Sequence, residues 1–335
     1  MDDDVLFQSR HMVKHFTLQK SITETISRSR PKKVHAVDDV SLTIHRGEVM
    51  GLIGESGSGK TTFGWIAAKL LAPTSGSLIY DGIDVSGLSG EELRRWRHHV
   101  QIVFQDPITS LNPRLKVWRI VGEPLMAAGV REKAAIMERV EKVLIDVGLP
   151  ERSVELYPHE FSGGGRQRIS LARALILDPE MIVLDEPTSA LDVAVQAQIL
   201  NRLIDLQKER NLTYLFISHN IGAVRYISDT VAIMYLGKVM EVGKVRDVME
   251  KPLHPYTRAL LLSVPVPDPV RRKFRFRIKG EIPTLVSPPP GCRFAGRCPF
   301  VRDRCRTEEP VLRGFVNGHT VACHFAEELE DKAIN

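Results

Sequence analysis

The segment GESGSGKT, from Gly54 to Thr61, has the residue types of a loop that binds a nucleotide phosphate. It fits the pattern G-x-x-x-x-G-K-[ST], in which glycines let consecutive backbone N–H groups turn toward one anion. Lys60 can reach the β- and γ-phosphates, and the hydroxyl of Thr61 can bind Mg²⁺. The alternative is a glycine-rich turn that fits by chance. A strand-like run before the loop and a helical run after it disfavour that alternative.

A second segment whose residue types could take part in a reaction is MIVLDEP, from Met181 to Pro187. In it, two acids follow four apolar residues. A buried strand that ends in this way can place Asp185 near the Mg²⁺ ion and leave Glu186 to polarise the attacking water as a general base. Alone, the pair would also fit an acidic turn after a core strand. Beside a phosphate loop, it indicates in-line hydrolysis of a nucleotide phosphate.

All the cysteines of the chain lie near its C-terminal end, with gaps of five, six and seventeen residues, at Cys292, Cys298, Cys305 and Cys323. Structural zinc sites use C-x₂₋₄-C pairs, and this spacing has none. His319 and His324 can join a zinc site, so zinc stays open. Four loosely spaced thiolates also suit an iron–sulfur cluster. Unligated buried thiols are the third alternative.

The elements that must position these residues alternate between strand-like and helical patterns. Strands are expected at 34–44 and 48–54, and a helix at 60–72. The apolar runs MIVLDE, TYLFISH and TVAIMY predict buried parallel strands. The stretch from about 89 to 177 is mostly helical and predicts a helical insertion. This alternation indicates an α/β fold with a parallel sheet.

Composition limits the function classes. The chain has 335 residues, a net charge of +5 and a pI of about 9.0, which is too mildly basic for a dedicated nucleic-acid binder. The N-terminal MDDDVLF does not read as a signal peptide, and no apolar run approaches a membrane helix. A cytosolic chain is expected, where clustered cysteines bind metal or stay free. The basic segment RRKFRFRIK, 271–279, predicts a strand with one solvated face, or a contact with headgroups or a partner.

The block FSGGGRQRISLARALILDPEMIVLDEPTSALD, 161–192, resembles the signature-to-D-loop region of ATP-binding-cassette (ABC) ATPases. The phosphate loop, Gln105 in VFQDP and His219 in FISH stand in the order of that family. The segments MYLGKVMEVG, KPLHPYTRALLLSVP and GCRFAGRCP resemble ATPase subunits of oligopeptide and dipeptide importers.

The resemblance implies a P-loop NTPase (RecA-like) core with an antiparallel β subdomain and a helical insertion, plus a small cysteine-rich C-terminal appendage. We expect a nucleotide-binding domain at 1–264, a proline-rich linker at 265–290 and a cysteine-rich domain at 291–335. The appendage is expected to be separate from the phosphate chemistry.

The resemblance also assigns roles to single residues. It implies that Glu186 is the base, that His219 contacts the γ-phosphate, and that Gln105 senses the Mg²⁺ and the water. Asp185 and Thr61 would join Gln105 in holding Mg²⁺, and Asp192 would lie at the dimer seam. The residues expected to contact ATP are Phe16, Gly54, Ser56, Gly57, Ser58, Gly59, Lys60, Thr61 and Thr62, with Ser162, Gly163 and Gly164 closing over the ATP of a partner. The four cysteines would hold a [4Fe–4S] cluster.

Simpler alternatives exist for several of these residues. His219 at the end of an apolar strand can be a core histidine, Gln105 a strand-end amide, Ser162 a helix N-cap and Phe16 a core residue. The adenine contact stays open between Phe16 and His35. Gly165 replaces the Gln usual in the family signature, from which we expect one of two ATP sites to be slower.

The function implied is an ATPase subunit that powers a peptide importer at the cytoplasmic face of the cell membrane, with ATP and Mg²⁺. Its expected partners are two permease subunits, a second ABC ATPase (a paralogue, or else a second copy of this chain) and a solute-binding protein, with no nucleic acid. The alternatives are a soluble ABC ATPase that acts on nucleic acid and a redox-sensing cassette. The transported substrate is not predicted.

Overall fold

The computed structural model describes residues 4–18, 31–263, 284–286, 288–315 and 318–329. They divide into two compact units. The first unit is built mainly from residues 87–218, with the short segment 44–49. The second contains residues 5–43 and 50–86 and the described residues from 219 onward.

A parallel sheet runs through the first unit in the order β8-β7-β6. The strands are β6 (Val100–Val103), β7 (Met181–Asp185) and β8 (Thr213–Ser218). Every residue of β7 and β8 is buried, as expected for strands covered on both faces. The prediction of buried parallel strands at MIVLDE and TYLFISH is therefore confirmed.

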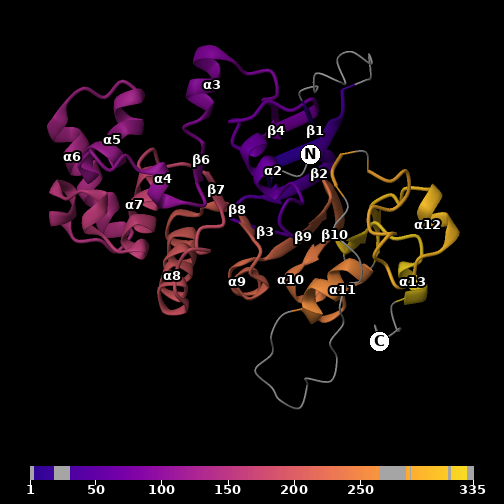
Figure 1. Ribbon diagram of the computed structural model, residues 1–335. Helices are drawn as coiled ribbons and strands as arrows, with labels where there is room; N and C mark the ends of the chain where they lie inside the picture. Colours follow the sequence, from indigo (N-terminus) through magenta and orange to yellow (C-terminus); the bar gives the residue numbers. More distant parts are fainter. Residues whose placement is uncertain (1–3, 19–30, 264–283, 287, 316–317, 330–335) are drawn as a thin grey trace. The chain divides into compact units, whose positions relative to one another are not determined.

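Helices make up most of the rest of the first unit, and α5, α6 and α7 gather into one group (Figure 1). Their bounds are α3 (Gly90–Trp96), α4 (Pro107–Ser110), α5 (Val117–Ala127), α6 (Lys133–Asp146), η1 (Glu151–Glu155), η2 (Pro158–Glu160), α7 (Gly163–Leu175) and α8 (Val193–Arg210). The helices pack closely in this group, since a Cβ on Gly122 of α5 would lie 2.5 Å from the side chain of Ile136 of α6. The stretch predicted as helical contains one strand, β6.

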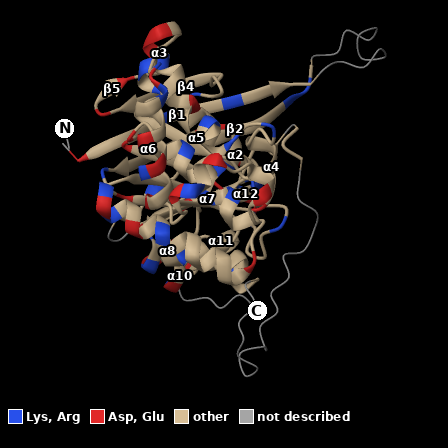
Figure 2. Ribbon diagram, turned by 90° about the vertical axis from the view of Figure 1, so that its left-hand side faces the viewer, with Lys and Arg blue, Asp and Glu red and all other residues tan. Residues whose placement is uncertain are grey.

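Charge on the first unit is mixed in sign where Figure 2 shows α3, which carries both blue and red segments. Arg94 and Arg95 lie 3.8 and 3.7 Å from the carboxylate of Glu91, one turn earlier on the helix. Exposed pairs of this kind contribute little to stability. Because these arginines stand beside an acidic residue, α3 does not carry the concentrated positive charge that a nucleic-acid-binding surface has.

An antiparallel sheet in the second unit has the strand order β2-β1-β4-β5. Its strands are β1 (Val5–Thr17), β2 (Lys33–His45), β4 (Ser75–Tyr80) and β5 (Ile83–Asp84). The predicted strand at 34–44 is confirmed as β2. Strand β1 was not predicted, and it pairs with β4, where Phe7 lies opposite Tyr80 and Val13 opposite Ser75.

The second unit also contains β3 (Val49–Ile53) and β9 (Thr230–Tyr235), which pair in parallel, and β10 (Lys238–Lys244), which runs antiparallel to β9. Two short strands of the C-terminal segment, β12 (Thr320–Val321) and β11 (Arg313–Gly314), extend this sheet beyond β10. The cysteine-rich segment is therefore joined to the cassette by strand pairing.

The helices of the second unit are α2 (Lys60–Ala67), α9 (Ile221–Ile227), α10 (Val245–Glu250), α11 (Pro255–Leu262), α12 (Asp303–Thr307) and α13 (Ala326–Leu329). Helix α2 ends five residues before its predicted end. Lys69 takes a left-handed φ of +48°, and the N–H of Leu70 turns back to bind the carbonyl of Trp65 at 2.8 Å. Among the described residues, no helix has the length and apolar character to cross a membrane.

The predicted proline-rich linker at 265–290 lies largely outside the described residues, and the basic segment 271–279 lies wholly outside them. Within the described part, Val286 forms a single β-bridge with Val34, and the N–H of His35 donates to the carbonyl of Leu285 at 3.0 Å. The end of the linker region thus contacts the start of β2.

Candidate active site

The loop between β3 and α2 has the curled backbone that its sequence predicts. Gly57 and Gly59 have φ values of +77° and +104°, where any side chain would strain the backbone. A Cβ on Gly54 would lie 2.1 Å from the carbonyl oxygen of Met234, and one on Gly59 would lie 2.0 Å from that of Ala36. The loop therefore requires glycine at three positions.

Lys60 begins α2 and is buried, with its ammonium turned into the loop. Its Nζ donates to the carbonyl of Gly54 at 2.8 Å, to the carbonyl of Glu55 at 3.0 Å and to Ser58 Oγ at 3.4 Å. The N-terminus of α2, with its positive dipole end, starts at the same residue. A buried cation, loop N–H groups and a helix N-terminus together make an anion site.

The other residues predicted to contact phosphate lie on the same loop and helix. Ser56 is exposed and Ser58 is buried, whereas Thr61 and Thr62 are half-buried in the first turn of α2. These positions place hydroxyl groups on both sides of Lys60. These are the positions at which the sequence pattern predicts the phosphate and Mg²⁺ contacts.

In the first unit, the two predicted acids lie at the end of β7. Asp185 is 2 % exposed, and Glu186 follows with a left-handed φ of +48°, rare for a residue with a side chain. The Glu186 N–H donates to the carbonyl of Ile217 at 2.9 Å, which holds this conformation. The side-chain amide of Gln105 donates to Glu186 Oε2 at 2.9 Å. The structure thus brings the predicted base and the predicted glutamine into direct contact.

The signature segment begins α7. Ser162 is its N-cap, and Ser162 Oγ accepts a hydrogen bond from the N–H of Gly165 at 3.3 Å. A Cβ on Gly164 would lie 2.4 Å from Val195 of α8, so this glycine permits close packing. A Cβ on Gly165 would lie 3.0 Å from the ring of Phe161. In this chain, the Phe161 side chain thus occupies space beside the position where the family signature usually has Gln.

Two predicted residues, His219 and Phe16, have surroundings that separate the alternatives, and a third, Asp192, caps a helix. His219 directly follows β8 and is exposed, so a buried core histidine is excluded. Phe16, on β1, is 39 % exposed, which excludes simple core packing. Its ring lies 5.2 Å from Lys14 Nζ. Asp192 is the N-cap of α8 and accepts a hydrogen bond from the N–H of Val195 at 2.9 Å.

His35, the other candidate for the adenine contact, belongs to a compact polar group. Its ring centroid lies 3.9 Å from that of His15, and both rings bind Asp38 at 3.3 Å. The carboxylate of Asp38 also forms an ion pair with the buried Arg293. Burial raises the pKa of Asp38, but Lys238, Arg293 and the two histidines outweigh it and hold the pKa below its usual value. His35 is thus engaged within its own unit.

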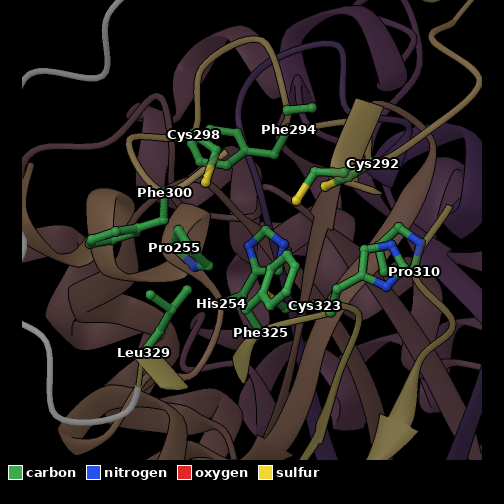
Figure 3. Close-up of a pocket in the computed structure, with 13 residues that line it drawn as sticks. His254, Pro255, Cys292, Phe294, Cys298, Phe300, Pro310, Cys323, Phe325 and Leu329 are labelled. Carbon is green, nitrogen blue, oxygen red and sulfur yellow. The ribbon is translucent and has the colours of Figure 1, made fainter. Parts of the chain in front are cut away.

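The cysteine-rich segment forms a pocket lined by all four cysteines, with His254, Phe294 and Phe325 among the other lining residues (Figure 3). Burial raises the pKa of Cys292 to about 11 and that of Cys298 to about 12, and the neighbouring thiols add to this rise. Main-chain N–H groups of Phe294 and Phe300 hydrogen-bond these sulfurs and oppose it. Without a bound metal, the two thiols are therefore protonated and unreactive at neutral pH.

His319 is not a ligand candidate in this pocket, contrary to the alternative drawn from the sequence. Its Nε2 lies 2.7 Å from Oε1 of Glu241, which is fully buried on β10. The same carboxylate accepts the N–H groups of Leu253 and His254 at 2.7 and 2.9 Å. His319 thus lies against a buried carboxylate on β10. His324 does line the cysteine pocket.

The expected separation between the cysteine-rich segment and the phosphate loop is wrong. Arg297, next to Cys298, donates from both terminal nitrogens to the two carboxylate oxygens of Glu55, at 2.7 and 3.1 Å. Glu55 is the second residue of the phosphate loop. Nothing in the sequence indicated this contact, because the two residues stand 242 positions apart.

Comparison with known proteins agrees with this geometry. The sequence model of the ABC transporter family matches residues 37–189, and that of the oligopeptide/dipeptide transporter C-terminal region matches residues 240–305. Oligopeptide transport ATP-binding protein AppF of Bacillus subtilis is 45 % identical over 96 % of this chain and 98 % of its own. The chain belongs to the ABC transporter ATP-binding proteins.

A second relative covers the chain to the same extent. Di/tripeptide transport ATP-binding protein DppF of Pseudomonas aeruginosa is 42 % identical over 97 % of this chain and 99 % of its own. Among solved structures, the dimeric ATP-binding cassette MJ0796 with ADP and Pi has a TM-score of 0.63 and 29 % identity, over 72 % of this chain and 99 % of that one. The predicted fold, a P-loop NTPase core with an antiparallel β subdomain, is confirmed.

Proposed function

We propose that this chain is the ATP-hydrolysing subunit of an ABC importer for di- or oligopeptides or related solutes. The observation that carries the proposal is the 2.9 Å hydrogen bond from Gln105 to Glu186, because it holds a carboxylate at the end of a buried strand of an ABC cassette. A general base must be oriented toward its water, and a glutamine partner does this. The oligopeptide/dipeptide C-terminal region, and relatives named for peptide transport, support peptides as cargo.

In this proposal the loop and α2 bind the phosphates. Lys60 would leave the carbonyls of Gly54 and Glu55 to meet the β- and γ-phosphates, and the glycine N–H groups would face the same oxygens. Thr61 and Asp185 would hold Mg²⁺, which neutralises the charge that develops on the phosphates. Glu186 would accept the proton of the attacking water. Gln105 would orient both water and carboxylate, and His219 would contact the γ-phosphate.

ATP would be enclosed between two cassettes. Ser162, Gly163 and Gly164 at the N-terminus of α7 present a hydroxyl and main-chain N–H groups, which suit a triphosphate bound by a second ATPase subunit. Asp192 would lie at the seam between the two cassettes. We propose a paralogous partner ATPase, with a second copy of this chain as the alternative.

A transport function also requires other protein partners. We propose two transmembrane permease subunits, which the ATPase drives, and a solute-binding protein that delivers the cargo. The chain would then work at the cytoplasmic face of the cell membrane as a peripheral subunit. The domain limits 1–264, 265–290 and 291–335 belong to the same proposal.

The four cysteines suit a [4Fe–4S] cluster better than a single zinc ion. In a tetrahedral zinc site with Zn–S bonds of about 2.3 Å, the sulfurs lie about 3.8 Å apart. Among the described residues, no three cysteine sulfurs come within 4.8 Å of one another. All four nevertheless line one apolar pocket, and Cys292 and Cys298 receive main-chain N–H···S bonds, as cluster ligands do. Anaerobic absorbance with iron, sulfide and zinc analysis tests this assignment. Zinc without iron would contradict it.

Phe16 is the better candidate for the adenine contact. Its ring is partly exposed, whereas His35 is engaged with His15 and Asp38. An exposed aromatic face can stack on a base. Phe16→Ala should weaken ATP binding, and His35→Ala should affect it less.

Uptake of labelled peptides tests the proposed function. Deleting the gene in its host should abolish uptake, and the wild-type gene, but not one encoding Lys60→Ala, should restore it. Uptake that persists in the deletion strain, together with salt-sensitive binding of the purified chain to DNA or RNA, would favour an ABC ATPase that acts on nucleic acid. The raised pKa values of Cys292 and Cys298 give no support to a redox-sensing cassette.

A further inference from the structure

Glu55, the second residue of the phosphate loop, is held both at its backbone and at its side chain by residues from the C-terminal part of the chain. Its carboxylate receives two hydrogen bonds from Arg297, and its N–H donates to the hydroxyl of Tyr256 at 2.9 Å. Arg297 also donates to the hydroxyl of Tyr235 at 3.2 Å. These contacts lie within one compact unit.

The ion pair has the geometry of a fixed contact. The Arg297 side chain is 8 % exposed and that of Glu55 21 %. Two parallel N–H···O bonds between guanidinium and carboxylate fix direction as well as distance. Exposed surface pairs lack this burial and contribute little. The pair therefore constrains the Glu55 side chain to one place.

The backbone of Arg297 is itself fixed by the cysteine-rich segment. Its N–H donates to the carbonyl of Phe294 at 2.9 Å, and Phe294 is fully buried. The Phe294 ring lies 5.4 Å from the rings of both Tyr235 and Tyr256. Cys292 and Cys298 flank this turn and line the pocket beside it (Figure 3). The fold of the cysteine-rich segment thus determines where Arg297 points.

Glu55 connects this segment to the phosphate-binding groups. Its carbonyl accepts hydrogen bonds from Lys60 Nζ at 3.0 Å and from the Ser58 N–H at 3.1 Å. A shift of the Glu55 backbone would therefore move the acceptor of the lysine and the start of the loop's turn. Loop N–H groups bind phosphate well only when they are already aligned.

We infer that Arg297 is a positioning residue of the nucleotide site, and that the cysteine-rich segment aligns the phosphate loop through the Arg297–Glu55 ion pair. The inference rests on the proposed function, since it assumes that this loop binds ATP. It makes the C-terminal segment a part of the ATP site. Arg297 acts through Glu55 and does not touch the nucleotide.

The test is ATP binding to the full chain, measured by titration calorimetry, together with KM and kcat for hydrolysis. Arg297→Glu and Glu55→Arg should each raise the Kd of ATP by about tenfold, the effect of losing a charge-assisted pair. KM should rise in parallel, while kcat at saturating ATP stays within about twofold. The double variant Glu55→Arg/Arg297→Glu restores the pair with reversed charges and should bring the Kd back to within about threefold of the wild type.

A matched control lies in the same segment. Arg304 makes an exposed bidentate pair with Glu308 at 2.7 and 2.8 Å, far less buried than the Arg297 pair. Arg304→Glu should leave the Kd unchanged. Arg297→Lys keeps the positive charge but loses the two parallel hydrogen bonds of the guanidinium group, and it should give an intermediate Kd. This variant still tests the positioning role if a charge-reversal variant fails to fold.

The outcomes separate the two proposals. Wild-type chain that does not bind ATP would overturn the proposed function. Wild-type chain that binds ATP, with an unchanged Kd for folded Arg297→Glu or Arg297→Lys, would overturn the positioning role. A reversed pair that gives no rescue would do the same, because a merely structural arginine predicts additive losses.

Discussion

Gln105 and Glu186 occupy equivalent places just beyond the ends of two neighbouring parallel strands. In the register of β6 and β7, Val103 lies opposite Leu184, and each residue of the pair stands two positions further along. The amide of Gln105 donates to the Glu186 carboxylate at 2.9 Å. The strand pairing therefore positions a water-orienting amide against the proposed base.

Gln105→Ala should slow ATP hydrolysis by roughly tenfold or more, because the carboxylate loses the group that orients it. ATP affinity should change little, since Gln105 does not belong to the phosphate loop. The rate of hydrolysis with and without saturating Mg²⁺ measures the first effect, and a titration of ATP binding measures the second. Gln101→Ala, on β6, removes an amide that donates to the carbonyl of Arg97, and should leave turnover unchanged. Equal losses in both variants would point to damage of β6 instead.

Lys60→Ala should weaken ATP binding by roughly 10- to 100-fold, because the phosphate charge loses its buried partner. The control is Lys116→Ala, which removes an exposed pair with Glu155 at 2.6 Å. Titration calorimetry on both variants gives the comparison. A wild-type Kd for the Lys60 variant would show that ATP is held elsewhere.

Gly165→Gln should raise hydrolysis in the assembled transporter by roughly two- to tenfold, if the missing amide slows one ATP site. Any side chain at position 165 also requires Phe161 to move, because a Cβ there would lie 3.0 Å from the Phe161 ring. Gly165→Ala tests that cost alone, since it adds the Cβ without the amide. An unchanged rate with Gln, in a variant as stable as the wild type, would reject the slow-site hypothesis.

His254 should make stability depend on pH. Burial is the main cause that lowers its pKa from the usual 6.5 to about 4, with Arg258 adding to the effect and Glu241 opposing it. In the unfolded chain His254 takes up a proton below pH 6.5, and in the folded chain only below about pH 4. Stability should therefore be complete above pH 6.5 and fall by on the order of 3 kcal/mol between pH 6.5 and 4.

The matched variant is His254→Asn. His254 is the N-cap of α11 and accepts the Tyr256 N–H through its side chain, a role that asparagine also fills. Denaturant unfolding at pH 7 and pH 5 should give a smaller loss for the variant than for the wild type. Parallel pH profiles would assign the dependence to other groups.

The parts of the fold predicted from sequence are those determined by local pattern. The apolar runs of β7, β8 and β9 were found because strands buried on both faces consist of continuous apolar residues. The end of α2 was missed because Lys69 takes a left-handed conformation that its residue type does not favour. Strand β1 was missed because its partner β4 is distant in sequence and nothing local marks the pairing.

The candidate site shows the same limit. The loop around Lys60 was predicted because its residues are consecutive and its glycines have a backbone role. The contact between Glu55 and Arg297 was not predicted, because it joins two ends of the chain through the tertiary fold. The sequence shows only that Arg297 lies in a basic, cysteine-rich segment. The structure shows that its side chain points toward the phosphate loop.

The rate of ATP hydrolysis by Glu186→Gln tests the central claim most directly. Glutamine keeps the shape of the side chain and can still bond Gln105, but it cannot accept the proton of water. The account predicts that the assembled transporter with this variant binds ATP like the wild type and hydrolyses it roughly 10²- to 10⁴-fold more slowly. Hydrolysis at the wild-type rate would contradict the assignment of Glu186 as the general base.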